Sequence, residues 1–593
     1  MSINSRIEAL RVLMSEENID AFIIPTGDPH QSEYIPEHYK NREWISGFTG
    51  GAGTVVITKD KAGLWTDGRY FIQAENEIIG TGYNLFKMDL PGVLTYEEWL
   101  RDNLKDGSTV GFDGRIYSQA AFEAMKKLLE SKNIKYKTDN DLVEKIWDDR
   151  PAFPESKAFI HELKYAGMEA IDKINLVRAA MDEYCAEFHI IGKLDDIAWL
   201  FNIRGADVPS NPMLISYAVI TKDKAILFVN ANKIDEDVRK YLLGQGVEVS
   251  GYEDVRSYIS SIPNESTILL DKSSLNSWVF NSIPKSCKTI NEMNPSFKLK
   301  SRKSEIELRN QKNAYIKDGV AVTKFLYWLE QSKEKFEVNE YTASEKLYEF
   351  RSQQDGFVST SFKTIMAFNE NAAMMHYRPS ESVHKIIEGD GLLLIDSGGQ
   401  YLDGTTDITR TIPYGKISDE QRTDCTLTLK SHIALIGARF LYGTSGHVLD
   451  SYARRPMWEV GMDYKCGTGH GIGYFLNVHE GPQRFHNTVV NNVALEENMI
   501  ISIEPGVYKK DRHGVRIENI GVVKKDIETE FGQFMKFETL SFVYIDTSAL
   551  NISMLTEKEI EWLNKYHSDV FEKISEHLTH EEITWLKEKT KRI

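Results

Sequence analysis

The chain has 593 residues and a mass of 67.8 kDa, a length that predicts about three to four domains. Hydrophobic residues make up 41% of it, enough to build substantial cores, which excludes wholesale disorder. The formal net charge of −17 argues against a large basic surface, so we expect neither a nucleic acid nor a membrane as a partner.

Cysteine usage and the first residues predict the compartment. The chain contains four cysteines, which are Cys185, Cys287, Cys425 and Cys466. They stand far apart without a CxxC pair, which suits a reducing interior better than a disulfide framework. Residues 1–20 predict an amphipathic helix rather than a signal peptide, and no apolar run approaches the roughly 20 residues of a membrane span. We therefore expect a soluble, cytoplasmic protein.

One stretch of sequence occurs twice. The heptapeptide VITKDKA occupies residues 56–62 and again residues 219–225, and each copy follows an aromatic and apolar segment that ends in glycine. Each copy also joins two strand-like runs through a charged turn, so chance convergence on a common hairpin is the alternative explanation. Because seven identical residues exceed what such a turn requires, we predict two tandem copies of one α/β domain.

A proline-containing segment and the start of a long helical pattern predict the domain boundaries. The proline-containing segment 147–157 is typical of a linker, and a long amphipathic helical pattern begins near Ser304. We therefore predict domains over residues 1–157, 158–300 and 301–593.

The last part of the third domain predicts a helical appendage. From about residue 551 the sequence carries two capping boxes, Thr556 with Glu559 and Thr579 with Glu582, and each opens an amphipathic pattern. Such pairs mark helix starts, so we expect two helices here.

Two aspartates of the third domain end or interrupt apolar strand-like runs. Asp396 ends the short apolar strand predicted at the start of the segment 392–401, where a turn-forming role before Ser-Gly-Gly is the simpler alternative. Asp407 lies in a β-branched run and shares a strand face with Thr409 and Thr411. Aspartate is depleted in strands and costly to bury alone, so a partner is expected, either a metal or an arginine.

A histidine and two glutamates follow. His470 has glycines on both sides, which lets backbone approach whatever it binds, although a surface turn is an equal alternative. Glu504 ends an apolar run, and Glu518 lies in a strand-like run with Arg516 on the same face. The two glutamates stand 14 residues apart, the length of a hairpin.

Taken together, these five residues predict a metal site. Four carboxylates cannot converge without cations or many donors, and two divalent ions would neutralise them. Carboxylates with one imidazole favour Mn²⁺ first, with Co²⁺, Fe²⁺ or Zn²⁺ as alternatives. Two such ions about 3.5–4 Å apart can acidify a water between them for hydrolysis.

The order Asp396, Asp407, His470, Glu504, Glu518 resembles the dinuclear site of the pita-bread metallopeptidases. This family includes methionine aminopeptidase, prolidase, aminopeptidase P and their metal-free relative creatinase. Longer stretches resemble the long, three-domain form of Xaa-Pro aminopeptidase (aminopeptidase P), and they are residues 25–34, 47–54, 65–71, 195–208, 396–411, 467–482, 516–519 and 557–567. The likeness extends over essentially the whole chain.

The resemblance implies a fold and an activity. The expected fold is α/β, with two tandem creatinase-N-like domains followed by a pita-bread catalytic domain that carries a C-terminal helical extension. The expected activity is removal of the N-terminal residue from peptides whose second residue is proline, by a homodimer that holds two metal ions. The implied metal ligands are Asp396, Asp407, His470, Glu504 and Glu518, with Asp407 and Glu518 as bridging carboxylates.

The resemblance also assigns roles to other side chains. Glu504 is similar to the family's general base, which passes a proton to the leaving imino nitrogen. His376 and His479 match two histidines that bind substrate and shuttle protons, and near neutral pH such imidazoles can hydrogen-bond the scissile carbonyl. Arg516 is a further substrate-binding candidate. Cys466 is another, at a position where many relatives carry a histidine; we expect activity with an altered substrate preference.

Three alternatives remain at this point. Prolidase, which accepts only dipeptides, is the nearest, although the duplicated N-terminal half and the helical tail favour the aminopeptidase. A metal-free creatinase-like enzyme is disfavoured because all five ligand positions are filled. The same fold also serves as a non-catalytic binding module in a histone-chaperone subunit, which the intact ligands argue against.

Overall fold

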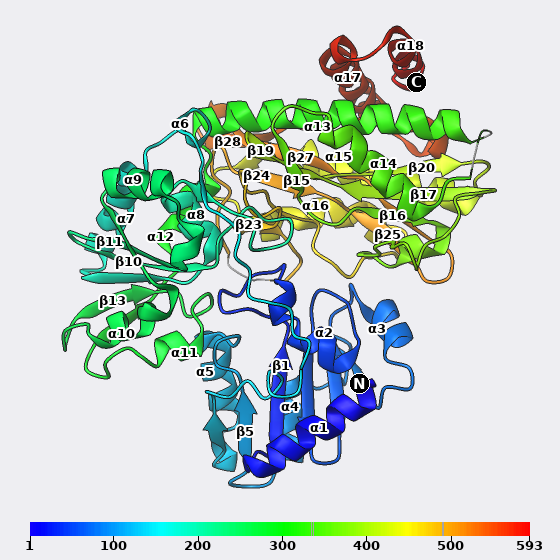
Figure 1. Ribbon diagram of the computed structural model, residues 1–593. Coiled ribbons are helices and arrows are strands. Elements are labelled where there is room, and N and C mark those ends of the chain that lie inside the picture. Colours follow the sequence, from blue (N-terminus) through cyan, green and yellow to red (C-terminus); the bar gives the residue numbers. More distant parts are fainter. Residues whose placement is uncertain (334, 336, 489–491) are drawn as a thin grey trace. The chain divides into compact units, whose positions relative to one another are not determined.

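The structure is a computed structural model that describes residues 1–333, 335, 337–488 and 492–593 (Figure 1). The chain forms two compact units. The first consists of Met1–Leu163 and Met168–Phe297, and the second consists of Lys164–Gly167 and Lys298–Ile593.

The first unit contains two six-stranded sheets. The first sheet has the spatial order β4 (Asn84–Lys87), β3 (Ala62–Thr66), β2 (Thr54–Thr58), β1 (Ala21–Pro25), β5 (Thr109–Phe112), β6 (Lys135–Lys137). The second has the order β12 (Val247–Ser250), β11 (Ala225–Val229), β10 (Ser216–Thr221), β8 (Phe188–Ile191), β13 (Thr267–Leu270), β14 (Lys288–Asn291). In the first sheet β2 pairs antiparallel with both β1 and β3, and in the second β10 pairs antiparallel with both β8 and β11. The other pairs in both sheets are parallel.

Helices are interspersed with the strands of each sheet along the chain. Those of the first sheet are α1 (Ile3–Glu16), α2 (Asn41–Ser46), α3 (Phe71–Glu77), α4 (Tyr96–Asn103) and α5 (Gln119–Leu128). Those of the second are α7 (Ala170–Glu183), α8 (Leu194–Leu200), α9 (Glu236–Gly244), α10 (Val255–Ser260) and α11 (Ser277–Phe280). The predicted N-terminal amphipathic helix is α1, which buries Ile7, Leu10 and Met14.

The repeated heptapeptide forms the same hairpin in both sheets. In the first copy Thr58 Oγ1 donates to Asp60 Oδ1 at 3.1 Å, and in the second Thr221 Oγ1 donates to Asp223 Oδ1 at 2.8 Å. Each turn therefore closes through the same side-chain contact between matching strands. Together with the shared strand order, this confirms two tandem α/β domains.

The second unit is a mixed α/β structure. Its strands form a three-stranded sheet β16 (Ile365–Phe368), β17 (Gly391–Ser397), β20 (Ile408–Tyr414) and a six-stranded sheet β21 (Phe440–Leu441), β28 (Gly532–Thr539), β27 (Asn519–Thr529), β24 (Ile500–Ile503), β22 (Gly469–Gly471), β23 (Glu480–Phe485). Smaller pairings are made by β15 (Phe357–Thr360), β18 (Gly399–Tyr401) and β19 (Gly404–Thr405), and by β25 (Gly506–Lys509) with β26 (His513–Arg516).

Long helices complete the second unit. They are α13 (Glu305–Ser332), α14 (Glu340–Ser352), α15 (Asp419–Ile436), α16 (Gly446–Trp458), α17 (Glu557–Ile574) and α18 (His580–Lys589). Both predicted capping boxes of the tail are present, at Thr556 and Thr579, and the two tail helices pack against α13 (Figure 1). A capping box satisfies backbone N–H groups that a helix start otherwise leaves unpaired.

Within the described residues, no helix combines the length and apolar character needed to cross a membrane. The domain boundaries near residues 157 and 300 stay predictions.

Candidate metal centre

Two antiparallel strands bring the aspartates to the site. Asp396 lies on β17 and pairs across the sheet with Thr409 of β20, and Asp407 directly precedes β20. Thr409 Oγ1 donates to Glu518 Oε2 at 2.8 Å, so Thr409, which the sequence places on the same strand face as Asp407, contacts the carboxylate cluster. Both aspartates are buried.

The glutamates flank a hairpin, as their spacing predicts. Glu504 directly follows β24, its N–H donates to Thr468 O at 2.8 Å, and the hairpin β25–β26 comes next. Glu518 follows this hairpin, and its N–H donates to Thr409 O at 3.1 Å. Each glutamate thus leaves a strand end with its backbone fixed to a neighbouring segment.

The glycines beside His470 lie close to neighbouring strands. A Cβ on Gly469 would lie 1.9 Å from Ser502 O, and a Cβ on Gly471 would lie 2.0 Å from Glu480 O. The glycines therefore let β22 fit between its neighbouring strands, and the approach of backbone to whatever His470 binds stays a prediction.

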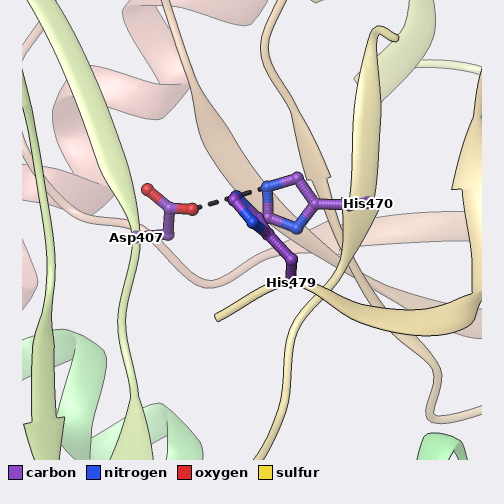
Figure 2. A group of neighbouring side chains, drawn as sticks. All are labelled: Asp407, His470 and His479. Carbon is purple, nitrogen blue, oxygen red and sulfur yellow. Dashed lines mark ion pairs between the residues drawn. The ribbon is translucent and has the colours of Figure 1, made fainter. Parts of the chain in front are cut away.

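The structure brings all five predicted ligands together, and His479 with them. Their ligand atoms lie within 4.8 Å of one another in three overlapping groups, which are Asp407, His470 and His479; His470, Glu504 and Glu518; and Asp396, Asp407 and Glu518. Figure 2 shows the Asp407 carboxylate pointing to the His470 ring, with the His479 ring beside it. The centroids of the two imidazole rings are 4.2 Å apart.

Burial and mutual repulsion dominate the electrostatics of the cluster. Burial, followed by the charges of neighbouring carboxylates, raises the pKa of Asp407 and of Glu518 well above the usual range. Burial opposes ionisation of Glu504 as well, but His470 Nε2, 3.1 Å from Glu504 Oε1, lowers its pKa. Burial would lower the pKa of His470, yet Glu504 outweighs burial and raises it to about 9. Without a bound cation, Asp407 and Glu518 are therefore favoured in their protonated, neutral form.

The donor set fits divalent ions. Asp396 Oδ1 and Glu518 Oε1 are buried and accept no hydrogen bond from the described residues. His470 Nδ1 lies 3.0 Å from the carbonyl of Gly471, which can only accept, so Nδ1 carries the proton and Nε2 faces the carboxylates. Orphaned carboxylate oxygens and an oriented imidazole are what a hard or borderline cation requires.

Arg516 has partners that the sequence did not predict. Its Nη2 donates to Asp396 Oδ2 and, at 3.4 Å, to Met375 O, while its Nη1 donates to Tyr508 Oη at 2.7 Å. Tyr508 was not among the predicted site residues. The only local sign is the alternation Glu504, Gly506, Tyr508, and in the structure a Cβ at Gly506 would lie 2.6 Å from the Tyr508 hydroxyl. That Arg516 binds substrate stays a prediction.

The remaining predicted residues lie near this arginine and tyrosine. His376 is half-buried and directly follows Met375, whose carbonyl accepts from Arg516. Cys466 is half-buried in an apolar cluster that also includes Tyr508, and its carbonyl accepts from Arg454 Nη2 at 2.7 Å. The roles of both residues stay predictions.

Four family models match the chain in order. Two are creatinase/prolidase N-terminal domains, at residues 6–145 and 149–307, followed by metallopeptidase family M24 at 309–525 and the C-terminal region of peptidase M24 at 533–593. The predicted creatinase-like duplicate and its catalytic partner are therefore confirmed.

Curated relatives are similar over the full length. Aminopeptidase P2 of Arabidopsis thaliana is 39% identical, over 97% of this chain and 86% of that protein. Xaa-Pro aminopeptidase 1 of Dictyostelium discoideum is 37% identical, over 100% of this chain and 97% of that protein.

Solved structures of related peptidases are similar to this chain as well. X-prolyl aminopeptidase from Caenorhabditis elegans, described as a cytosolic enzyme with a di-nuclear active site, is 32% identical with a TM-score of 0.96, and 100% of each chain is covered. An Xaa-Pro dipeptidase from Bacillus anthracis, 23% identical with a TM-score of 0.51, shares the fold over 64% of this chain and 99% of its own. This chain therefore belongs to metallopeptidase family M24, in its long, three-domain aminopeptidase P form.

Proposed function

We propose that this chain is a dinuclear-metal aminopeptidase that hydrolyses the N-terminal Xaa-Pro bond of peptides and releases the first residue. The convergence of Asp396, Asp407, His470, Glu504 and Glu518 carries this proposal. The full-length similarity to Xaa-Pro aminopeptidases supports it over a prolidase or a non-catalytic binding module.

The five converging side chains would hold two divalent ions. We take Mn²⁺ as the first choice, with Co²⁺, Fe²⁺ or Zn²⁺ as alternatives, because oxygen ligands outnumber the single imidazole. Such ions would polarise the scissile carbonyl and acidify the attacking water. Asp407 and Glu518 would be the bridging carboxylates, since of the four carboxylates these are the two that each belong to two of the groups of neighbouring ligand atoms.

Glu504 and two histidines would handle protons and substrate. Glu504 accepts a proton from the attacking water and delivers it to the proline nitrogen, which must be protonated to leave. His479 lies beside His470, and His376 follows Met375 at the edge of the site, so both can hydrogen-bond the substrate carbonyl. Arg516, held by Tyr508, positions Asp396 and could also meet substrate.

A substrate with proline at position two explains a dedicated site. The Xaa-Pro amide has no N–H and its ring fixes the chain direction, so peptidases that read an extended backbone lose a donor. A site built from imidazole and carboxylate groups does not require that donor.

The direct test compares peptides and metals. After metal removal we expect no turnover, and after Mn²⁺ is restored we expect turnover of Xaa-Pro-Xaa tripeptides but not of matched Xaa-Ala-Xaa tripeptides. Activity confined to Xaa-Pro dipeptides would instead support prolidase. Protein purified with near-zero metal occupancy that gains no activity with added Mn²⁺ would support the binding module.

We expect Cys466→His to change substrate preference while activity is kept. The imidazole adds a hydrogen-bond donor beside Tyr508 without altering a carboxylate of the cluster. Ratios of kcat/KM across peptides that differ at the first or second residue should shift by about threefold or more, equivalent to roughly 0.7 kcal/mol. Unchanged ratios across the whole panel would contradict a substrate-binding role for position 466, and Cys466→Ser controls for loss of the thiol.

The cellular setting is part of the proposal. We propose a cytoplasmic homodimer that acts on peptides and binds no nucleic acid. The four cysteines, all among the described residues, form no disulfide, and the Caenorhabditis elegans relative is described as cytosolic. We also propose the domain ranges 1–157, 158–300 and 301–593.

A further inference from the structure

A buried arginine lies directly behind the carboxylate cluster. Arg410 of β20 is 2% exposed and lies three residues after Asp407, on the strand face opposite Thr409. Among the described residues, no carboxylate accepts a hydrogen bond from its guanidinium. A buried cation without a paired anion is costly unless its donors are well satisfied, so its neutral acceptors have to be placed accurately.

One side of this guanidinium joins two segments of the site. Arg410 Nη1 donates to Thr409 O at 2.8 Å and to Glu518 O at 2.6 Å. These carbonyls belong to the strand that begins after Asp407 and to one of the proposed bridging residues. Arg410 therefore fixes the backbones that carry the two proposed bridging carboxylates.

The other side of the guanidinium reaches the C-terminal region. Arg410 Nη2 donates to the hydroxyl of Tyr566, on α17, at 2.6 Å and to Val543 O at 2.7 Å. The Tyr566 hydroxyl itself lies 2.7 Å from Val543 O, and its ring stacks on Trp562 with a centroid distance of 5.3 Å. The tail helix thus supplies one of the acceptors on which the buried cation depends.

A second branch leads from Arg410 to the glutamate strand. Asn519 Oδ1 accepts from Arg410 Nη2 at 2.7 Å, Asn519 Nδ2 lies 3.1 Å from His432 Nε2, and His432 Nδ1 lies 3.0 Å from Ile503 O. Because Ile503 O can only accept, Nδ1 carries a proton. Burial and the charge of Arg410 lower the pKa of His432 to about 3, so Nε2 is an acceptor for the Asn519 amide. The chain of bonds ends one residue before Glu504.

We propose that Tyr566 is a positioning residue for the metal centre, acting through Arg410, Asn519 and His432 on the backbones beside Asp407, Glu504 and Glu518. This inference rests on the proposed function. It makes the C-terminal helix α17 a part of the active site, although none of its residues belongs to the carboxylate cluster.

Tyr566→Phe tests this by removing one hydroxyl from the full-length protein. We expect Mn²⁺ to bind the metal-free variant about tenfold more weakly, within the range seen when partners behind metal ligands are removed. We expect kcat for an Xaa-Pro tripeptide to fall while KM changes by less than about twofold, since no substrate contact is lost.

Tyr401→Phe is the matched control. Its buried hydroxyl donates to Asp318 Oδ1 at 3.0 Å in the same unit, so its loss destabilises the fold by a comparable mechanism. We expect a lower unfolding midpoint but unchanged Mn²⁺ affinity. Equal Mn²⁺ affinities of Tyr566→Phe and Tyr401→Phe would overturn the proposal, whereas wild-type protein that binds none of Mn²⁺, Co²⁺, Fe²⁺ and Zn²⁺ would overturn the proposed function.

A second pair of variants tests the other branch independently of the tail. His432→Asn retains an N–H that can donate to Ile503 O, whereas His432→Leu has no donor there. We expect weaker Mn²⁺ binding by His432→Leu than by His432→Asn when their unfolding midpoints are similar. Equal affinities of these two variants would overturn the role of this branch.

Discussion

Replacing Glu504 with Gln is expected to lower kcat/KM for an Xaa-Pro peptide by about 10²–10⁴-fold, the usual contribution of a general acid–base group. The fold should persist, because glutamine has nearly the same shape and Ser502 Oγ, 3.0 Å from Glu504 Oε1, can still donate to the amide oxygen. The variant loses the negative charge that accepts the proton. Steady-state kinetics with restored Mn²⁺ measures this effect.

The same variant has a spectroscopic consequence in the metal-free protein. Although burial disfavours the charged imidazole, Glu504 raises the pKa of His470 to about 9, so Glu504→Gln should bring that pKa down, which a proton NMR titration detects. Glu496→Gln is a suitable control, because Glu496 forms a surface pair with Arg302 and should leave both measurements unchanged. Near wild-type turnover of Glu504→Gln would contradict its role as the base.

Asp407→Asn is expected to abolish turnover and, in the metal-free protein, to increase stability at neutral pH. Burial and three neighbouring carboxylates raise the pKa of Asp407 well above its ordinary 3.8. An acid with a raised folded-state pKa contributes stability below its unfolded pKa and loses it as pH rises toward the folded value, by about 1.4 kcal/mol per pH unit. Asparagine has no such titration, so the advantage of the variant should grow as the pH rises above the ordinary value of 3.8 toward the raised pKa of Asp407.

Added metal should make the wild type more stable than Asp407→Asn. With Mn²⁺ at about 100 times its dissociation constant, the wild type gains roughly 2.7 kcal/mol per site, while the variant has lost a proposed bridging ligand. Asp403→Asn is the contrasting control, because Asp403 pairs with Lys317 at 2.6 Å and its loss should lower stability. Thermal unfolding across pH, with and without Mn²⁺, separates these cases. Equal stabilisation of wild type and Asp407→Asn by Mn²⁺ would rule out Asp407 as a ligand.

The sequence predicted the convergence of the ligands because their local contexts are unusual. Carboxylates such as Asp407 and Glu518 within apolar, β-branched runs are costly to bury without partners, so each one signals a site. The duplicated hairpin could also be predicted from a local pattern, since the same Thr-Lys-Asp-Lys turn recurs in both copies.

What could not be predicted depends on register and on contacts distant in sequence. The contacts of Arg516 with Tyr508 and Asp396 require the hairpin β25–β26 to lie against β17, and no local pattern specifies that arrangement. Arg410 and Tyr566 are separated by 156 residues along the chain. The close approach of Gly469 and Gly471 to the neighbouring strands is also beyond a local pattern, because it depends on which strands lie beside β22.

The separation of the site residues along the chain has a consequence for how the enzyme matures. The carboxylates extend from Asp396 to Glu518, and the hydrogen bonds behind them end at Tyr566. During synthesis the strands emerge long before α17, and the unpaired carboxylates oppose their own assembly. If Tyr566 positions the centre as proposed, we expect metal loading to come late in the life of this polypeptide, and a nascent chain that stops before α17 to bind its ions with reduced affinity.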